Sequence, residues 1–286
     1  SDGQHGFPID LVKDKLCCST EQALDFIARY VVNGVSEQVN IPNRTALSEP
    51  EKPREFSPPE HDISPKRVMA YLIKTRGIDP EIVKAMIQRK MIAEDSVRHN
   101  CLFFGRDENG VIRSCALRGS TDVKFRGEAP GGDKSCTFAM VGHNDVLRLF
   151  ESPIDAMSHS TFTKLLGKDW TADHRLSVNG SGNYESIKRY LANHMEIKSV
   201  WFCYDSDQAG RDGSGASSSR IFEDFPGREL SVMFCSPVKN KDWNEALQLF
   251  RVLESHGVAV REFLAPTEFR SIPPPDCEQD EFECEL

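Results

Sequence analysis

The stretch WFCYDSDQAGR at residues 201–211 decides the fold that the sequence predicts. Its first half is apolar and aromatic, as in a buried strand, and it leads into two carboxylates, Asp205 and Asp207. Because side chains alternate along a strand, both carboxylates are expected on the same side. Two carboxylates this close repel each other unless a cation lies between them, and hard oxygen ligands on a short loop suit Mg²⁺. The alternative is a solvated acidic turn before a helix N-terminus, where acids are favoured without any metal.

A second stretch, VLRLFESPIDAM at residues 146–157, has the same organisation. An apolar strand ends at a carboxylate, Glu151, and Pro153 stands where the first turn of a helix accepts proline. Parallel α/β sheets place functional groups at the carboxyl ends of their strands. We therefore expect Glu151 and the aspartate pair to meet at one edge of a sheet.

The two motifs, ESPIDA at residues 151–156 and YDSDQAG at residues 204–210, together resemble the Toprim domain. That metal-binding fold is shared by bacterial primases, topoisomerases and some nucleases. The segment KDWN at residues 241–244 also resembles a later K-D-x-D segment of primases. The resemblance implies metal ligands at five acids: Glu151, Asp155, Asp205, Asp207 and Asp242.

The resemblance also implies roles for these acids. Asp205 and Asp207 would bind the metal directly, and Glu151 would be a further ligand or a general base. The other two acids would orient the ligands or hold a second ion. The chain departs from the primase pattern at two positions, because Asn244 replaces the second acid and Ser152 replaces a glycine. Arg211 either contacts a phosphate or pairs with Asp207.

Strand and helix patterns alternate through residues 136–250, which predicts an α/β fold with a mostly parallel, Rossmann-like sheet flanked by helices. The Asn-Gly-Ser-Gly sequence at residues 179–182 is expected at the same edge as the acids, where it either approaches phosphate with backbone N–H groups or forms a simple turn. The strands are expected at 138–141, 146–150, 175–178, 199–204 and 229–234, with helices from 153 and 184, after 210 and from 242.

Residues 63–135 are expected to form a smaller α+β subdomain. Helices should start at Ser64-Pro65 and Asp79-Pro80, Gly77 should end the first one, and the turn at residues 107–110 predicts a hairpin. YLIKTRGI at residues 71–78 and the later hairpin resemble the subdomain that precedes the Toprim domain in bacterial primase cores and carries basic template-binding residues. The candidates here are Lys74, Arg76, Arg106, Arg113, Arg118, Lys124 and Arg126, and an ordinary solvated face is the alternative.

The flanking segments carry weaker signals. Residues 1–32 have the apolar spacing of a small helical hairpin and also resemble the tail of a primase zinc ribbon, without its Cys and His ligands. Residues 33–62 are polar and proline-rich, which predicts a linker. Residues 251–286 are expected to be an acidic, disordered tail. Two roles stay open for this tail: binding a partner and mimicking the charge of DNA.

Composition limits the classes of protein that the chain can be. The net charge of −9 argues against binding nucleic acid with the whole surface, although Lys and Arg outnumber Asp and Glu between residues 63 and 134. The nine cysteines show no C-x-x-C pair, which fits a reducing cytosol. Without a long apolar segment or an amino-terminal signal, we expect a cytoplasmic protein with no membrane partner.

The resemblance implies a primase-like nucleotidyltransferase, acting on DNA in the replication or transfer of a plasmid or other mobile element. It implies Mg²⁺ or Mn²⁺ as cofactor and single-stranded DNA and nucleotides as substrates, and it allows a helicase or relaxase as partner. Two alternatives stay open: a Toprim nuclease that uses the same metals, and a non-catalytic DNA-binding module of a mobilisation protein. A topoisomerase is disfavoured, because no domain with a tyrosine nucleophile accompanies the core.

Overall fold

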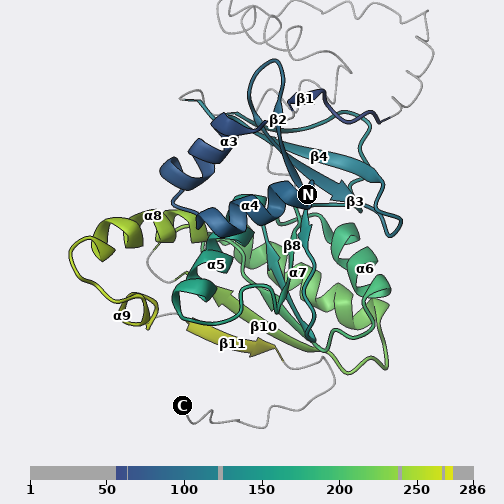
Figure 1. Cartoon of the computed structure of the whole chain (residues 1–286). Coiled ribbons are helices and arrows are strands. Elements are labelled where there is room, and N and C mark those ends of the chain that lie inside the picture. The colour runs from purple at the N-terminus through teal and green to yellow at the C-terminus, as the bar shows by residue number, and fades with distance from the viewer. Residues whose placement is uncertain (1–55, 63, 122–124, 238–239, 266–267, 273–286) are drawn as a thin grey trace, which may run out of the picture. The chain divides into compact units, whose positions relative to one another are not determined.

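Two β-sheets carry the described part of the chain (Figure 1). The computed structural model describes residues 56–62, 64–121, 125–237, 240–265 and 268–272, which all belong to one compact unit. The predicted helical region at residues 1–32, most of the predicted linker and Lys124 lie outside the described residues. No helix in the described ranges is long and apolar enough to cross a membrane.

The first sheet is antiparallel and holds the predicted hairpin. Its strands follow the order β1-β2-β3-β4-β5. The β3–β4 turn closes as predicted, because the Asp107 carboxylate accepts hydrogen bonds from the N–H groups of Asn109 and Val111, and Gly110 has φ +77°. The bounds are β1 (His61–Asp62), β2 (Ile92–Asp95), β3 (Cys101–Arg106), β4 (Ile112–Arg118) and β5 (Arg126–Glu128).

Helices α3 (Lys66–Ala70), η1 (Tyr71–Thr75) and α4 (Pro80–Gln88) pack beside this sheet. Asp79 caps α4 and Pro80 opens it, as the sequence predicts, and Gly77 with φ +72° ends the preceding helical segment. Val68, Val83 and other apolar residues of these helices join a cluster that also contains residues of the second sheet and its helices. The two sheets therefore share part of one apolar core.

The second sheet confirms the predicted α/β fold class. Its order is β11-β10-β9-β7-β8-β6, in which β10, β9, β7 and β8 are parallel and the two edge strands are antiparallel. Strand β7 has the predicted bounds. The bounds are β6 (Ala139–Met140), β7 (Val146–Phe150), β8 (His174–Ser177), β9 (Ser199–Phe202), β10 (Ser231–Ser236) and β11 (Glu268–Ile272).

Helices cover both faces of the parallel sheet (Figure 1). One face packs Leu149 and Val200 against α6 (Tyr184–Asn193) and α7 (Gln208–Asp224). The other face packs against the remaining helices α5 (Pro153–Leu165), α8 (Trp243–Glu254) and α9 (Val260–Leu264). Helix α5 begins at the predicted proline, with Ser152 as its cap.

Strands β6, β8 and β10 differ from their predicted bounds by one or two residues, and three further differences have a physical reason or extend the fold. Strand β9 ends at Phe202 rather than Tyr204, and α7 begins at Gln208 rather than after Gly210, because Asp207 caps this helix. The prediction of a disordered tail from residue 251 is wrong for the described residues there. Helix α8 continues to Glu254, α9 follows, and β11 pairs with β10 along five residues.

Candidate functional site

Glu151 and Asp205 meet at the carboxyl edge of the parallel sheet. Glu151 directly follows β7, and Asp205 lies in the loop after the neighbouring parallel strand β9. The backbone N–H of Asp205 donates a hydrogen bond to Glu151 Oε1 at 3.3 Å. The expected proximity of these acids is therefore present, and it is held by a backbone contact as well as by the sheet.

Asp207 has two partners, a helix and a lysine. Its carboxylate accepts a hydrogen bond from the N–H of Gly210 at 3.0 Å, which caps α7. The ammonium of Lys241 lies 3.2 Å from Asp207 Oδ2 and 3.9 Å from Asp205 Oδ2. The Gly210 N–H and the Lys241 charge lower the pKa of Asp207. A cation does lie between the two aspartates, and in this structure it is an ammonium group.

Of the two roles expected for Arg211, the structure does not show the ion pair with Asp207. The Arg211 guanidinium donates to the carbonyl of Ser206 and to the side-chain oxygen of Gln208. The difference arises because Asp207 caps the helix on which Arg211 lies, while Lys241 reaches the carboxylate from another segment.

Asp155 is buried behind this edge, and both of its carboxylate oxygens accept hydrogen bonds. One carboxylate oxygen accepts the N–H of Asn244 at 3.0 Å, and the other accepts the hydroxyl of Ser152. Asn244 itself is 3% exposed, and its amide bonds the carbonyl and guanidinium of Arg76 and the hydroxyl of Ser158. The Asn244 side chain is therefore hydrogen-bonded to Arg76, the C-cap residue of η1, and it does not point toward the other acids.

Asp242 caps α8. Its carboxylate accepts the N–H of Glu245 at 2.7 Å. The following residue, Trp243, is buried and its indole N–H donates to the carbonyl of Cys203, just after β9, at 3.0 Å. Strand β9 and the start of α8 are thereby tied together, which places Asp242 near the carboxyl edge of the sheet.

Negative charge accumulates at this edge without full compensation. Burial, followed by the charges of Glu151, Asp155 and Asp242, raises the pKa of Asp205 to about 8. Burial is also the main reason why the pKa of Glu151 is raised, with Asp207 contributing. Burial and the nearby Asp242 raise the pKa of Asp155. Such a group of acids favours a bound cation, and clusters of perturbed pKa values are typical of functional sites.

The donor chemistry fits a hard divalent cation, because all five candidates offer carboxylate oxygens. However, within the described ranges no three of these carboxylates bring an oxygen each within 4.8 Å of one another. Asp205 and Asp207 are accessible to a metal ion, since their side chains are 18% and 41% exposed. Binding there requires Lys241 to move, and its side chain is 55% exposed and anchored by no other described acid.

We expect the metal-free protein to lose stability as pH rises from about 5 to about 8. The folded protein retains the Asp205 proton until its pKa of about 8, whereas the unfolded chain releases it near the ordinary value of 3.8. The folded state therefore binds more protons in this window, and its free energy of unfolding falls with rising pH. Asp207 stays charged throughout, because its pKa is lowered.

Urea unfolding in the presence of a chelator at several pH values measures this effect. The Asp205→Asn variant lacks the titrating group and should show a shallower decline than the wild type. Equal slopes for the two proteins would contradict the raised pKa of Asp205.

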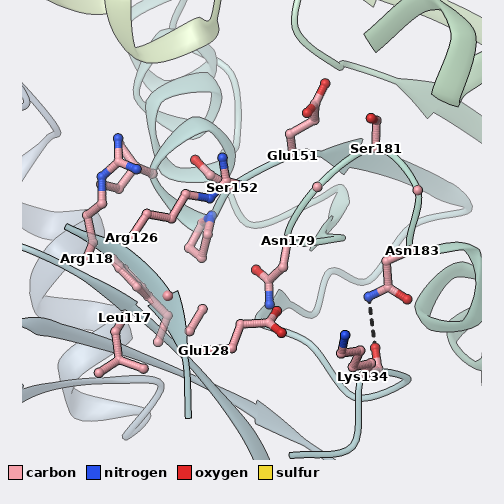
Figure 2. Close-up of a pocket in the computed structure, with 17 residues that line it drawn as sticks. Leu117, Arg118, Arg126, Glu128, Lys134, Glu151, Ser152, Asn179, Ser181 and Asn183 are labelled. Carbon is pink, nitrogen blue, oxygen red and sulfur yellow. Dashed lines mark hydrogen bonds between the residues drawn. The ribbon is translucent and has the colours of Figure 1, made fainter. Parts of the chain in front are cut away.

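A pocket of about 480 Å³ adjoins Glu151 and is lined from both sheets (Figure 2). Arg118 and Arg126, on β4 and β5, lie on one side of it, and the loop at residues 179–183 lies on the other. Asn179 has φ +56°, and the Asn183 amide donates to the carbonyls of Val178 and Lys134. The predicted turn at residues 179–182 therefore frames the pocket.

The structure separates the predicted basic residues into two groups. Arg118 and Arg126 line the pocket, and neither forms a hydrogen bond or ion pair through its side chain with the described residues. The other guanidinium groups are engaged elsewhere: Arg76 with Tyr71 and Asn244, Arg106 with the carbonyls of Lys90 and Gly110, and Arg113 with Asp107. Lys74 is exposed on η1.

Sequence reasoning missed Lys134, which also lines the pocket. It belongs to the basic stretch that ends at residue 134, but it lies outside every predicted strand and helix. Its position depends on the hydrogen bond that its carbonyl accepts from Asn183, a residue 49 positions away in the chain. A local pattern contains no signal for such a contact.

Comparisons with known proteins match both halves of the described chain. Residues 148–247 match the model of a family described as Toprim-like, and residues 70–144 match one described as a protein of unknown function, DUF3991. The uncharacterized protein pXO2-78 of Bacillus anthracis is 28% identical over 206 residues, which cover 63% of this chain. The match spans 56% of the length of that relative.

Solved primases are similar at lower identity. The primase fragment of the bacteriophage T7 primase-helicase protein is 17% identical with a TM-score of 0.46, and the match covers 64% of this chain and 71% of that one. The zinc-binding and RNA polymerase domains of Aquifex aeolicus primase are 14% identical with a TM-score of 0.45, and the match covers 93% of this chain and 71% of that one. A primase domain from Pseudomonas aeruginosa is 18% identical with a TM-score of 0.40, and the match covers 76% of this chain and 65% of that one. Residues 148–247 of this chain are a Toprim-like domain, as the motifs at residues 151–156 and 204–210 predicted.

Proposed function

We propose that the chain is a primase-like nucleotidyltransferase that uses Mg²⁺ or Mn²⁺ and acts on single-stranded DNA. The observation that carries the proposal is the acidic edge beside a basic pocket. Glu151 belongs to both, because it accepts the N–H of Asp205 and also lines the pocket with Arg118 and Arg126. Phosphoryl transfer needs cation sites next to groups that bind phosphate. A nuclease would use the same acids, but a pocket of about 480 Å³ suits a nucleotide.

Each group of residues has a proposed role. Asp205 and Asp207 would hold the divalent cation, which when bound would neutralise charge on the transferring phosphate. Glu151 would be a further ligand or would accept the proton of the attacking hydroxyl, and its raised pKa suits the second role. Asp155 and Asp242, engaged with backbone N–H groups, would orient this edge or support a second ion.

A role in plasmid or other mobile-element replication is part of the proposal. Its support is the relative pXO2-78, whose name refers to the Bacillus anthracis plasmid pXO2. A helicase or relaxase as partner stays a prediction from the resemblance, and a cytoplasmic location stays a prediction from the composition.

Incorporation of labelled ribonucleotides and deoxyribonucleotides on single-stranded DNA, with Mg²⁺ or Mn²⁺, tests the proposed function. We expect template-dependent products that disappear with a chelator. Shortening of the template instead would establish a nuclease. DNA binding without either reaction would establish an accessory module and would contradict the proposed transferase.

The Arg118→Ala/Arg126→Ala variant is expected to bind single-stranded DNA more weakly than the wild type. Its affinity should also depend less steeply on the salt concentration. Each lost phosphate contact lowers the slope of log K against log salt by about 0.7, so the expected decrease is roughly 1.4. Fluorescence anisotropy at several salt concentrations measures it.

A matched control removes the same charge away from the pocket. Lys188 and Arg220 lie on α6 and α7, where they pair with Asp224 and Glu185, and both side chains are 48% exposed. The Lys188→Ala/Arg220→Ala variant should keep the wild-type slope. If both double variants change the slope equally, the pocket has no special part in DNA binding.

A further inference from the structure

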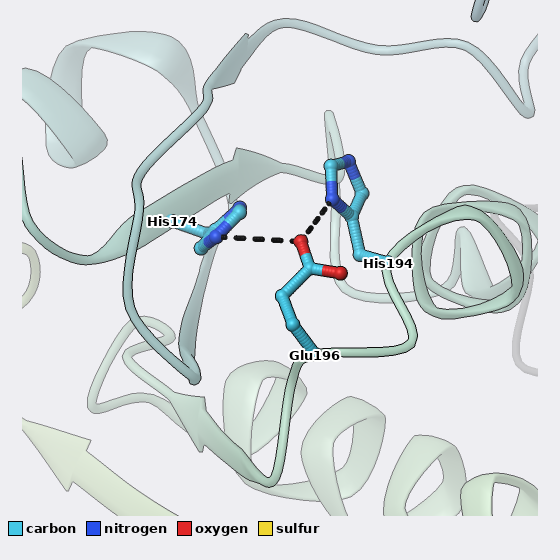
Figure 3. Close-up of side chains that lie close together, drawn as sticks. All are labelled: His174, His194 and Glu196. Carbon is cyan, nitrogen blue, oxygen red and sulfur yellow. Dashed lines mark hydrogen bonds and ion pairs between the residues drawn. The ribbon is translucent and has the colours of Figure 1, made fainter.

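Two histidines and a glutamate gather at the amino edge of the parallel sheet, opposite the acids (Figure 3). His174 opens β8, His194 is the C-cap residue of α6, and Glu196 lies in the loop before β9. One ligand atom from each of the three lies within 4.8 Å of the others. Glu151 and Asp205 instead follow strands parallel to these, so the two groups are separated by the length of the strands.

The contacts leave one buried nitrogen without a partner. Glu196 Oε1 lies 2.7 Å from His194 Nδ1 and 3.8 Å from His174 Nε2. His174 is 1% exposed, and among the described residues its Nε2 has no hydrogen-bond partner. Buried polar atoms are normally paired, and this one is directed at the carboxylate of Glu196 across a gap longer than a hydrogen bond.

The other nitrogen of His174 is held in place. His174 Nδ1 lies 2.9 Å from the hydroxyl of Tyr190, whose ring stacks on His194 with centroids 4.2 Å apart. When the Nδ1–H donates to this hydroxyl, the lone pair of Nε2 points at Glu196. Histidines that bind metals usually have their second nitrogen hydrogen-bonded in this way, which fixes both tautomer and ring orientation.

We propose that His174 Nε2, His194 Nδ1 and Glu196 Oε1 bind one zinc-class divalent ion. Two imidazole nitrogens and one carboxylate oxygen are a ligand set that Zn²⁺ accepts, and water can complete the tetrahedron because Glu196 is half exposed. Burial and the neighbouring His194 lower the pKa of His174, so its ring is neutral near pH 7, as a metal ligand must be. The three ligand atoms, now within 4.8 Å of one another, would draw closer around the ion.

The ion would join α6, the loop after it and β8. The guanidinium of Arg228 already holds this loop, because it donates to the carbonyls of Leu191, His194 and Ile197 at 2.6–2.7 Å. The loop geometry should therefore persist without metal, and the ion would add stability rather than create the fold. This inference is independent of the proposed transferase, since none of its ligands belongs to the acidic edge or the pocket.

Zn²⁺ titration of the chelator-stripped full chain against a chromophoric chelator tests the site. The nine cysteines can also bind Zn²⁺, so the readout is the difference between the wild type and His194→Ala/Glu196→Gln. We expect the double variant to lose one equivalent, with an affinity at that site at least about 100-fold weaker. Tyr190→Phe, which keeps the stacking ring, should weaken it about 10- to 100-fold. Co²⁺ bound at this site should show no thiolate charge-transfer band.

His143→Ala is the matched control. His143 is 65% exposed and lies 3.8 Å from Asp169, outside the cluster, so its removal should leave the equivalent in place. Circular dichroism verifies that each variant is folded, and Zn²⁺ should raise the melting temperature of the wild type but not of the double variant. Equal stoichiometry, affinity and melting shift in those two proteins would overturn the proposal and leave a hydrogen-bonded His–Glu cluster.

Discussion

Replacing Asp205 and Asp207 together with asparagine is expected to reduce nucleotide incorporation by about 10³-fold or more. The change removes the two charges that would hold the divalent cation, and a 10³-fold loss corresponds to about 4 kcal/mol of transition-state stabilisation. Asparagine keeps the size of the side chain and can still accept the Gly210 N–H that caps α7. The rate of incorporation on single-stranded DNA, at equal protein and metal concentrations, is the measurement.

The Asp205→Asn single variant should be at least as stable as the wild type without metal. Asp205 is held in a place that disfavours its charge, as its pKa of about 8 shows, and the neutral amide removes that repulsion. A loss of activity without a loss of stability would separate a role in metal binding from a role in folding. Asp145→Asn is the control, because Asp145 is exposed and precedes β7, whose other end leads to Glu151. Activity of the double variant within about tenfold of the wild type would exclude these two aspartates as metal ligands.

The fold was predictable from local patterns where one element carried a complete signal. The apolar run before Glu151 set the bounds of β7, and Pro153 set the start of α5. Alternation of strands and helices was sufficient for the parallel sheet. At the other end, the weakly apolar composition of residues 268–272 predicts a tail. It forms edge strand β11 because β10 offers a free edge, which only the assembled sheet reveals.

The candidate site was predictable in its acids but not in their partners. The alternation of side chains along a strand running to Tyr204 predicts both aspartates on one side, whereas β9 ends at Phe202 and Asp207 is a helix cap. Lys241, which lies between them, comes from a segment 34 positions beyond Asp207. Likewise, Asn244 bonds Arg76, which is 168 positions earlier in the chain. The residue that replaces the second acid of the primase pattern therefore ties two helical segments together. Sequence spacing cannot reveal contacts of this range.

Gly210 is the residue on which the geometry of this edge depends most directly. It lies in the first turn of α7, where its N–H donates a hydrogen bond to the capping residue Asp207. A Cβ at this position would lie 2.2 Å from the carbonyl oxygen of Asp205 and 3.1 Å from Glu151 Oε1. The helix can therefore approach the loop after β9 this closely only because residue 210 has no side chain.

Gly210→Ala is accordingly expected to destabilise the protein by about 3 kcal/mol, the upper part of the range for overpacking, since backbone must move to relieve the contact. The melting temperature should fall by about 6–12 °C. Incorporation should fall by about 100-fold beyond any loss of folded protein, because a shift near 1 Å in Asp205 or Glu151 misplaces the metal ligands. Gly215→Ala is the matched control on the same helix. Its Cβ would meet no atom within 4 Å, so it should raise stability by about 0.5–1 kcal/mol and leave the rate unchanged. If the two alanine variants behave alike, the close approach of α7 to Asp205 does not set the geometry of the acids.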